Sequence, residues 1–367
     1  MTLIALLIAL IILLVLILPW LGARLFLAGP NLAQFDNDTG EHFGKGRPEH
    51  PNVTAAMARL APSNAAPPGL TRKQRIAFKR DKFDHMFDDL AFDAAFTPVD
   101  SNGVHGEWVT APGCDPSRRM LYLHGGGFVV GSPRSHRPLT ARMAAATGGA
   151  VLALDYRLLP EHKRTDGIAD ARQAYRWLLG HGPGGADGKD AAATVFVAGD
   201  SAGANLALSL LAWIRSEGLQ APAAAVAISP PTDATWSSPS IRSNLATDYM
   251  LGPAIKTITR LPHTLTLWAS WITSGIRPCD PLISPVHGDL AGLPPLLVHV
   301  SATEMLYDDA RRYVNKARAA GSPAMLQSWN NTLHVWHMFP ELPESAEALA
   351  EIARFIARVA PHHKVSA

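Results

Sequence analysis

Charged residues are scarce in this chain: Asp, Glu, Lys and Arg make up 17% of its 367 residues, and the formal net charge is only +2. A nucleic-acid-binding surface needs a surplus of Lys and Arg to neutralise phosphates, so the composition argues against a nucleic-acid partner. The two cysteines, Cys114 and Cys279, are far apart and form no metal-like pair. They neither require nor exclude an oxidising compartment. No internal repeat is present, which excludes a repeat architecture.

Hydrophobic residues, in contrast, make up 47% of the chain and are enough for a large buried core. They are also concentrated at the start, because residues 2–23 contain no charge and are mostly Leu and Ile. A helix of about 22 residues is roughly 33 Å long, enough to cross a hydrocarbon layer of about 30 Å. The sequence therefore predicts a membrane anchor over residues 1–28.

The alternatives to an anchor are a cleaved signal peptide and a buried soluble helix. Against the signal peptide, no basic residue precedes the run, the run is too long and no clear cleavage site follows it. A soluble helix would need a polar face, which this run lacks. The nearest basic residues, Arg24, Lys45 and Arg47, follow the run and favour a cytoplasmic position for the rest of the chain.

Residues 29–103 are interpreted as a linker and an N-terminal cap region. The first part, 29–68, is rich in Pro, Asn, Gly and Ala and indicates a connector with at most one short helix. Residues 71–92 alternate basic and apolar residues at helical spacing. An amphipathic helix that covers the core is the first interpretation, and a lid or a membrane-surface helix is the alternative.

From residue 104 to 367 short β-rich runs alternate with Ala-rich helical runs, which predicts a mainly parallel sheet with helices on both faces. Residues 232–281 interrupt this alternation and indicate an insertion over the active site. The expected strands are 120–123, 151–154, 194–198, 225–228, 296–300 and 325–329, and the expected helices are 138–147, 168–179, 202–216, 310–319 and 345–359.

Gly-Asp-Ser-Ala-Gly at residues 199–203 follows one of these strands and precedes an Ala- and Leu-rich helix. Strand, tight turn and helix in this order are typical of a nucleophile elbow, in which glycines two positions either side of the central residue make room for close packing. The elbow makes Ser201 the candidate nucleophile. Asp200 shares the turn with Ser201 and is excluded as the catalytic acid.

His-Gly-Gly-Gly-Phe at residues 124–128 follows the strand at 120–123. Consecutive glycines let backbone N–H groups approach a substrate, as stabilisation of a tetrahedral oxyanion requires. We expect the oxyanion donors to be the amides of Gly126, Gly127 and Ala202. A phosphate-binding loop is disfavoured, because neither G-x-G-x-x-G nor a P-loop Lys-Ser/Thr is present. His124 is expected to fix this loop by hydrogen bonding.

The general base should be a histidine late in the chain, if the order nucleophile, acid, histidine holds. His334 and His337 both follow the strand at 325–329, and His334, which comes first in the loop, is preferred. A metal site made by this pair is disfavoured, since no third ligand with suitable spacing is evident. No metal or organic cofactor is expected.

The acid should follow the strand at 296–300, where Glu304, Asp308 and Asp309 lie. Glu304 is in the loop, whereas Asp308 has the position of an N-cap for the next helix. The acid has only to orient the imidazole and stabilise its cation, so a glutamate serves as well as an aspartate. Glu304 is preferred, with the aspartates as alternatives.

These motifs, together with Asp-Tyr-Arg-Leu-Leu-Pro-Glu-His at 155–162, resemble the hormone-sensitive-lipase family of α/β-hydrolases over about residues 104–358. The resemblance implies an α/β-hydrolase fold, and a cap built from the N-terminal region and the 232–281 insertion. It places the family acid on Glu304, where Asp is commoner, and the family histidine on His334. It also implies hydrolysis of carboxylic esters without a cofactor.

The sequence therefore predicts a serine carboxylesterase with Ser201, His334 and Glu304 as its triad, acting on esters with short to medium acyl chains. An amidase or acyltransferase with the same triad is one alternative. A non-catalytic receptor on the hydrolase fold is another, and His334 argues against it. Expected partners are a small-molecule ester and, through residues 1–28, a lipid bilayer; an oligomer is possible.

Overall fold

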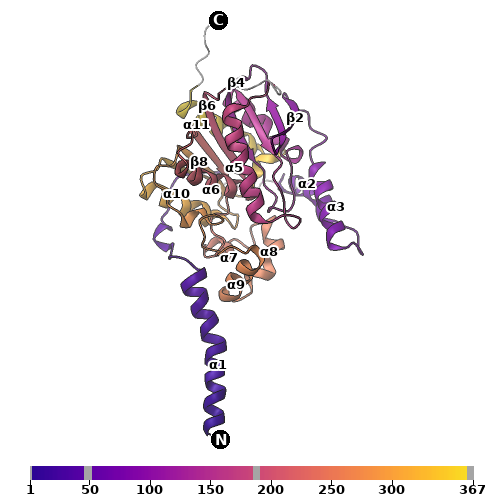
Figure 1. The fold of residues 1–367 in the computed structure, drawn as a ribbon. Coiled ribbons are helices and arrows are strands. Elements are labelled where there is room, and N and C mark those ends of the chain that lie inside the picture. The colour runs from indigo at the N-terminus through magenta and orange to yellow at the C-terminus, as the bar shows by residue number, and fades with distance from the viewer. Residues whose placement is uncertain (1, 45–51, 185–190, 362–367) are drawn as a thin grey trace.

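The protein is described here from a computed structural model, which describes residues 2–44, 52–184 and 191–361. A central sheet is covered by helices on both faces, and one helix, α1 (Thr2–Gly22), projects from the lower end of the domain in Figure 1. Two of the basic residues used to orient the chain, Lys45 and Arg47, lie outside the described residues.

Within the described residues the strands form one nine-stranded sheet in the order β1-β9-β8-β7-β6-β4-β5-β3-β2. All neighbouring strands are parallel except β2 with β3 and β3 with β5. The prediction of a mainly parallel sheet is thus confirmed. The strands are β1 (Glu41–Phe43), β2 (Ala95–Ser101), β3 (Val104–Thr110), β4 (Asp115–Leu123), β5 (Gly149–Leu154), β6 (Thr194–Asp200), β7 (Ala224–Ile228), β8 (Leu296–Ser301) and β9 (Ala324–Trp329).

Helices α5, α6 and α10 pack on one face of this sheet, and α2, α4 and α11 pack on the other. Helices α7, α8 and α9 lie near the carboxyl edge of the strands. After α1, the helices are α2 (Val53–Asn64), α3 (Arg72–Asp84), α4 (Arg137–Thr147), α5 (Arg164–Gly180), α6 (Ala202–Ser216), α7 (Ser240–Ser243), α8 (Leu251–Thr259), α9 (His263–Ser274), α10 (Tyr307–Ala319) and α11 (Pro343–Val359).

The two faces of the sheet have separate hydrophobic cores, as the alternation of side chains along a strand requires. Along β4, Leu121 and Leu123 join the core under α5 and α6, whereas Met120 and Tyr122 join the core under α4 and α11. All four side chains are buried. A strand buried on both faces must be apolar throughout, which is why the central strands could be recognised from short continuous apolar runs.

Three strands were not predicted. The hairpin of β2 and β3 turns at Asn102-Gly103, where both residues have positive φ (53° and 74°), a sequence signal for a two-residue hairpin. Strand β1 is three residues long and pairs with β9 at the edge of the sheet. Both β1 and β2 precede residue 104, so the sheet extends into the region interpreted as linker and N-terminal cap.

The interval 232–281 contains α7, α8 and α9, which follow β7 and lie at the carboxyl edge of the sheet (Figure 1). On another side α3 holds the loop after β4: the Arg80 guanidinium donates to the carbonyl oxygen of Val129 at 2.8 Å, and Ser132 donates to Asp84 at 2.7 Å. The helix expected within residues 71–92 therefore packs on the glycine-rich loop.

Residues Leu3–Leu27 form a stretch of 25 residues that contains an 18-residue window with a mean hydropathy of 3.2, and it is long and apolar enough for a membrane anchor or a signal sequence. Several large side chains along α1 are exposed, as at Leu3 and Val15. At its carboxyl end α1 continues into a π-helical turn, Ala23–Leu27, in which Ala23 and Leu27 are buried against α9.

Candidate active site

Ser201 lies at the sharp turn between β6 and α6. Its backbone angles, φ 49° and ψ −121°, are rare for a residue other than glycine and are those of a nucleophile elbow. The Ser201 N–H donates to the carbonyl oxygen of Ile228 at 2.7 Å, and the Ser201 carbonyl oxygen accepts from the N–H of Asn205 at 3.1 Å. These bonds hold the turn, so the hydroxyl lies at the N-terminal end of α6.

The two glycines of the elbow are required by close backbone approaches. A Cβ on Gly199 would lie 2.6 Å from the carbonyl oxygen of Gly203, and a Cβ on Gly203 would overlap the carbonyl oxygens of Leu123 and His124. Backbone atoms in a buried sheet cannot move aside as a flexible side chain can. The elbow can therefore pack against β4 only with glycine at both positions.

Gly203→Ala is expected to lower the free energy of unfolding by about 3 kcal/mol, the upper end for an overpacked core site. The matched control is Gly180→Ala at the end of α5, where an added Cβ meets no atom within 4 Å and alanine is the better helix former. Denaturant unfolding followed by circular dichroism measures both variants. Equal midpoints for the two would contradict the close approach at Gly203.

The imidazole of His334 lies between Ser201 and Glu304. Its Nε2 is 2.9 Å from Ser201 Oγ, and its Nδ1 is 3.5 Å from Glu304 Oε2. The second distance is longer than an ordinary hydrogen bond, a looseness that is common before substrate binds. The three side chains come from loops after β6, β8 and β9, since parallel strands present their carboxyl ends at one edge of the sheet.

The alternatives weighed in the sequence lie elsewhere. His337 Nε2 is 3.0 Å from His299 Nδ1 inside the core. Asp308 accepts a hydrogen bond from the Ser240 N–H at 2.8 Å and forms an ion pair with Arg311 at 2.7 Å. Asp309 accepts a hydrogen bond from the Thr232 N–H at 2.7 Å. The structure therefore brings the preferred base and the preferred acid to the candidate nucleophile, and it brings none of the three alternatives there.

The electrostatic environments of His334 and His337 also favour His334 as the base. Burial of His334 lowers its pKa, but the carboxylates of Glu304, Asp248 and Asp200 together outweigh burial and leave the pKa above the usual 6.5. Burial also lowers the pKa of His337, and the neighbouring His299 adds to this effect, so the pKa is held well below the usual value. His334 can take up a proton and hold it as a cation, whereas His337 stays neutral.

The glycine-rich loop leaves backbone N–H groups without acceptors next to the elbow. Among the hydrogen bonds of the described residues, none has the amide of Gly126, Gly127 or Ala202 as its donor. Gly126 and Gly127 have φ of 109° and 62°, values that glycine adopts freely. These are the three amides predicted to stabilise an oxyanion.

Asp200 holds this loop to the elbow, a role the sequence analysis did not foresee. One carboxylate oxygen accepts from the Tyr122 hydroxyl at 2.7 Å and from the Gly125 N–H at 3.1 Å, and the other is 3.3 Å from His136 Nε2. A Cβ on Gly125 would overlap this carboxylate. Asp200 thus fixes the distance between the loop and the turn that carries the serine.

His124 stiffens the same loop from within. Its ring stacks on Tyr156 at 4.3 Å between centroids, and the Tyr156 hydroxyl donates to the His124 carbonyl oxygen at 2.7 Å. Burial lowers the pKa of His124 to about 3, so the ring is neutral. This is the structural role expected for His124.

Ser229, directly after β7, joins the acid to the histidine loop and was also missed. Its hydroxyl donates to Glu304 Oε2 at 2.9 Å and accepts from the Val335 N–H at 3.2 Å. Ser229 and Val335 both have positive φ, 49° and 53°, a strained conformation that is especially unfavourable for a β-branched residue. The sequence signal that could have identified Ser229 is its position directly after a central strand.

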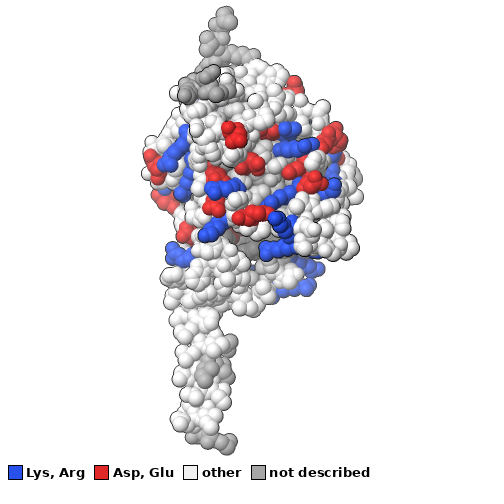
Figure 2. Space-filling view, turned by 45° about the vertical axis from the view of Figure 1, so that its right-hand side comes forward, with Lys and Arg blue, Asp and Glu red and all other residues white. Residues whose placement is uncertain are grey.

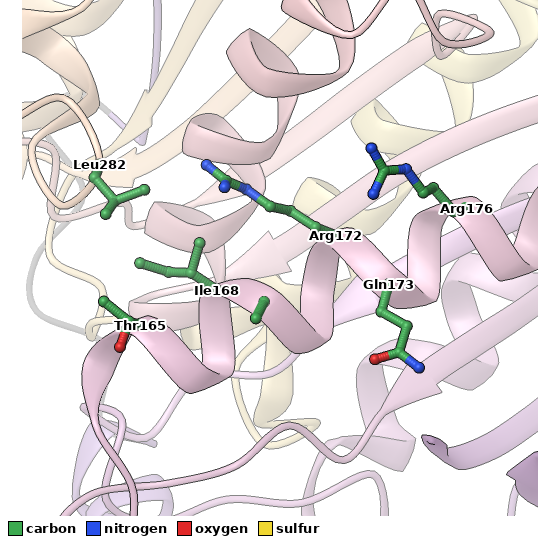
Figure 3. Close-up of a pocket in the computed structure, with 7 residues that line it drawn as sticks. Thr165, Ile168, Arg172, Gln173, Arg176 and Leu282 are labelled. Carbon is green, nitrogen blue, oxygen red and sulfur yellow. The ribbon is translucent and has the colours of Figure 1, made fainter. Parts of the chain in front are cut away.

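Of the surface depressions among the described residues, one flanks the site and another lies away from it. One of about 170 Å³ lies beside the His334 loop and is lined by Val53, Thr247, Tyr249, Thr303, Asn331, Thr332 and Leu333. Another of about 480 Å³ lies along α5, where Figure 3 shows Ile168, Arg172 and Leu282. The second contains no residue of the triad or of the glycine-rich loop, so it is not part of this site.

Among the described residues, no group of three or more His, Cys, Asp or Glu side chains is arranged to hold a metal ion. The parallel sheet, the strained serine elbow and the Ser–His–acid arrangement at its carboxyl edge define the class: an α/β hydrolase.

Comparison with known proteins agrees with this class. The sequence profile of the family described as "alpha/beta hydrolase fold" matches residues 120–338. An acetyl-hydrolase of Streptomyces hygroscopicus is 42% identical over 291 residues, covering 78% of this chain and 90% of the relative. An esterase of Acinetobacter venetianus is 34% identical over 260 residues, covering 70% and 80%.

A solved esterase from the bacterial hormone-sensitive lipase family is 35% identical and superposes with a TM-score of 0.70, covering 85% of this chain and 99% of that chain. The chain therefore belongs to the hormone-sensitive-lipase family of α/β hydrolases and is a carboxylic ester hydrolase. The resemblance noted from the motifs is confirmed.

Proposed function

We propose that this protein hydrolyses carboxylic esters through an acyl-enzyme formed on Ser201. The observation that carries the proposal is the 2.9 Å approach of His334 Nε2 to Ser201 Oγ, with Glu304 on the opposite side of the ring. The unpaired amides of Gly126, Gly127 and Ala202 lie on the two segments that meet at the serine.

In the first half-reaction the Ser201 hydroxyl gives its proton to His334 Nε2 while Oγ forms a bond to the ester carbonyl carbon. The carbonyl oxygen takes the electron pair and becomes an oxyanion, which the three amides stabilise. When the bond to the alcohol oxygen breaks, His334 returns the proton to that oxygen. The alcohol leaves and the acyl group stays on Ser201.

In the second half-reaction water replaces the alcohol. His334 removes a proton from the water, whose oxygen attacks the acyl carbon, and the same amides receive the new oxyanion. The bond to Ser201 Oγ then breaks, Oγ takes the proton from His334, and the carboxylic acid leaves. Throughout, the Glu304 carboxylate stabilises the imidazolium and holds the His334 proton on Nδ1.

The raised pKa of His334 sets an expected pH dependence. Only neutral His334 can accept the serine proton, so kcat/KM should fall with acid, with a midpoint above the usual 6.5. In Glu304→Gln the attraction is lost while burial remains, so the midpoint of the residual activity should move to lower pH. Product acid measured by chromatography from pH 5 to pH 9 tests this. A wild-type midpoint at or below that of the variant would contradict the assignment.

The substrate class proposed is an ester with a short to medium acyl chain. The similarity to an acetyl-hydrolase supports a short acyl group. A panel of p-nitrophenyl esters of graded chain length, with a matched p-nitrophenyl amide, tests both the chain length and the bond cleaved. A rate that rises steadily with chain length would contradict the short-chain proposal, and equal rates on ester and amide would favour an amidase.

We also propose that α1 anchors the protein in a membrane and that residues 29–103 supply part of the cap over the catalytic domain. The apolar stretch from Leu3 to Leu27 supports the anchor by its length and hydropathy. Alkaline carbonate extraction of membranes from expressing cells tests it, because a spanning protein stays in the pellet. Release into the supernatant would contradict anchoring.

A further inference from the structure

Helices α8 and α9 expose apolar side chains that no other described part of the chain covers. Ile258 at the end of α8, Leu261 after it, and Leu265 and Ile272 on α9 are 40%, 42%, 54% and 75% exposed. We call these four residues the cap surface. Leu265 and Ile272 are seven residues apart, two helical turns, so both project from one side of α9, whereas Leu267 is buried. Large apolar side chains exposed together on neighbouring helices mark a site of contact with another apolar phase.

Helix α9, which carries two residues of the cap surface, packs against the end of α1. Trp268 of α9 donates its indole N–H to the carbonyl oxygen of Pro19 at 3.0 Å. A Cβ on Gly22 would lie 3.2 Å from the Trp268 ring, and Leu267 packs with Ala23 of the π-helical turn. Figure 1 shows α8 and α9 beside the end of the domain from which α1 projects. Because α9 packs on the end of α1, the orientation of α1 in a bilayer would also determine the orientation of α9.

The charges around this surface favour anionic lipid headgroups. No Asp or Glu occurs in residues 20–35 or in residues 249–279, whereas Arg24, Lys256, Arg260 and Arg277 do. All four are exposed, and Arg24 lies over the Trp20 ring at 5.5 Å. In Figure 2 the acidic residues of the visible face lie above the end that carries α1. Tryptophan rings and basic side chains at the end of an apolar helix are typical of a membrane interface.

The cap is also bonded to the loop that carries the proposed catalytic acid. The Asn244 side-chain amide donates to the carbonyl oxygens of Ala302 and Glu304 at 3.0 and 2.9 Å. The Asp248 carboxylate accepts from the Met305 N–H at 2.9 Å and from the Leu251 N–H, the start of α8, at 2.8 Å. The segment that leads into α8 is therefore attached to the loop that carries Glu304.

We propose that the cap surface lies in the headgroup region of the bilayer that α1 crosses, so that the carboxyl edge of the sheet and Ser201 face the membrane. Esters dissolved in the bilayer then reach the site without crossing water. The position of the cap rests on the proposed anchoring by α1, and the choice of bilayer esters as substrates rests on the proposed function. A protein partner is the less favoured occupant, because α9 packs against an apolar helix and the cap surface is bordered by cations.

The full chain, reconstituted in vesicles of phosphatidylcholine and phosphatidylglycerol, tests the position of the cap. In a Cys114→Ser, Cys279→Ser background, a single cysteine is introduced by Ile272→Cys, Leu10→Cys or Ala319→Cys and labelled with a polarity-sensitive fluorophore. Ile272 is on the cap surface and Leu10 in α1; Ala319 is exposed at the end of α10, which leads to the amino end of β9. Quenching by lipid-borne nitroxide and by aqueous iodide is then compared.

The expected result is that the labels at residues 10 and 272 are quenched by lipid nitroxide, deep and shallow respectively, while the label at 319 is quenched by iodide alone. Lipid quenching at residue 10 combined with iodide quenching at residue 272 equal to that at 319 would overturn the proposal and leave anchoring intact. Iodide quenching at residue 10 would overturn both.

A second variant tests the consequence for substrate. Leu265→Asp with Ile272→Asp should leave the hydrolysis of a water-soluble short ester unchanged, since neither residue is in the catalytic site. It should slow hydrolysis of a short-chain ester of a lipophilic alcohol dissolved in the vesicles by about tenfold, because charged side chains leave the interface. Equal rates for wild type and variant on the vesicle substrate would contradict bilayer access. If the wild type hydrolysed neither substrate, the proposed function itself would be contradicted.

Discussion

Ser201→Ala is expected to lower kcat for ester hydrolysis by about 10⁶, the loss typical of a triad that acts as one unit. The substitution removes the atom that attacks the carbonyl and the proton that His334 receives at 2.9 Å. It leaves the backbone bond from Ser201 to Ile228, so the fold should persist. Steady-state hydrolysis of a p-nitrophenyl ester and circular dichroism on the same preparation measure the two effects.

Ser216→Ala is the matched control, because Ser216 is exposed at the far end of the same helix. Its hydroxyl donates only to the carbonyl oxygen of Trp213 in the helix end. Unchanged kcat is expected for this variant. If Ser201→Ala kept kcat within tenfold of the wild type, the nucleophile would have to be another residue.

Glu304→Gln is expected to lower kcat by about 10⁴, the effect seen when an amide replaces a triad carboxylate and stabilises the wrong tautomer of the histidine. Glutamine has nearly the shape of glutamate and can still accept the bond from Ser229, so the loss should come from chemistry. The expected signature is a fall in kcat with little change in KM or in the unfolding midpoint.

Asp308→Asn distinguishes Glu304 from Asp308, one of the two aspartates that the sequence left open as alternatives. Asp308 bonds Ser240 and Arg311 and has no contact with His334 among the described residues. Its substitution should lower the unfolding midpoint and leave kcat within tenfold. A larger loss of kcat in Asp308→Asn than in Glu304→Gln would reverse the assignment of the acid.

Much of the fold could be predicted because the central strands are buried on both faces. Such strands are short apolar runs, and most are followed by a helix of clear periodicity, as at β6 and α6. The three-residue edge strand β1 has neither property, since its residues are exposed or half-buried and its pairing with β9 comes from tertiary structure. Edge strands of this length carry no local signal.

The chemical groups of the site could be predicted from the sequence, but the groups that support them could not. Ser201 and the glycine-rich loop occur in motifs whose spacing reflects backbone geometry. Asp200 and Ser229 act through partners distant in sequence, such as Tyr122 and Glu304. Contacts of this kind are created by the register of the sheet, which local patterns do not encode.

The contact between the cap and α1 is a further example of a contact that local sequence patterns do not encode. Trp268 stands in a segment whose composition indicated only an insertion, and its bond to Pro19 spans 249 residues of sequence. Proximity of this kind depends on how the insertion folds over the sheet.

The most direct test of the account is a crystal structure of the protein after reaction with an alkyl phosphonate, which mimics the tetrahedral intermediate. We predict a covalent bond from Ser201 Oγ to phosphorus, with the phosphoryl oxygen about 2.7–3.1 Å from the amides of Gly126, Gly127 and Ala202. His334 should lie within hydrogen-bond distance of the ester oxygen that represents the leaving group. An adduct on another residue, or a phosphoryl oxygen directed away from all three amides, would contradict the account.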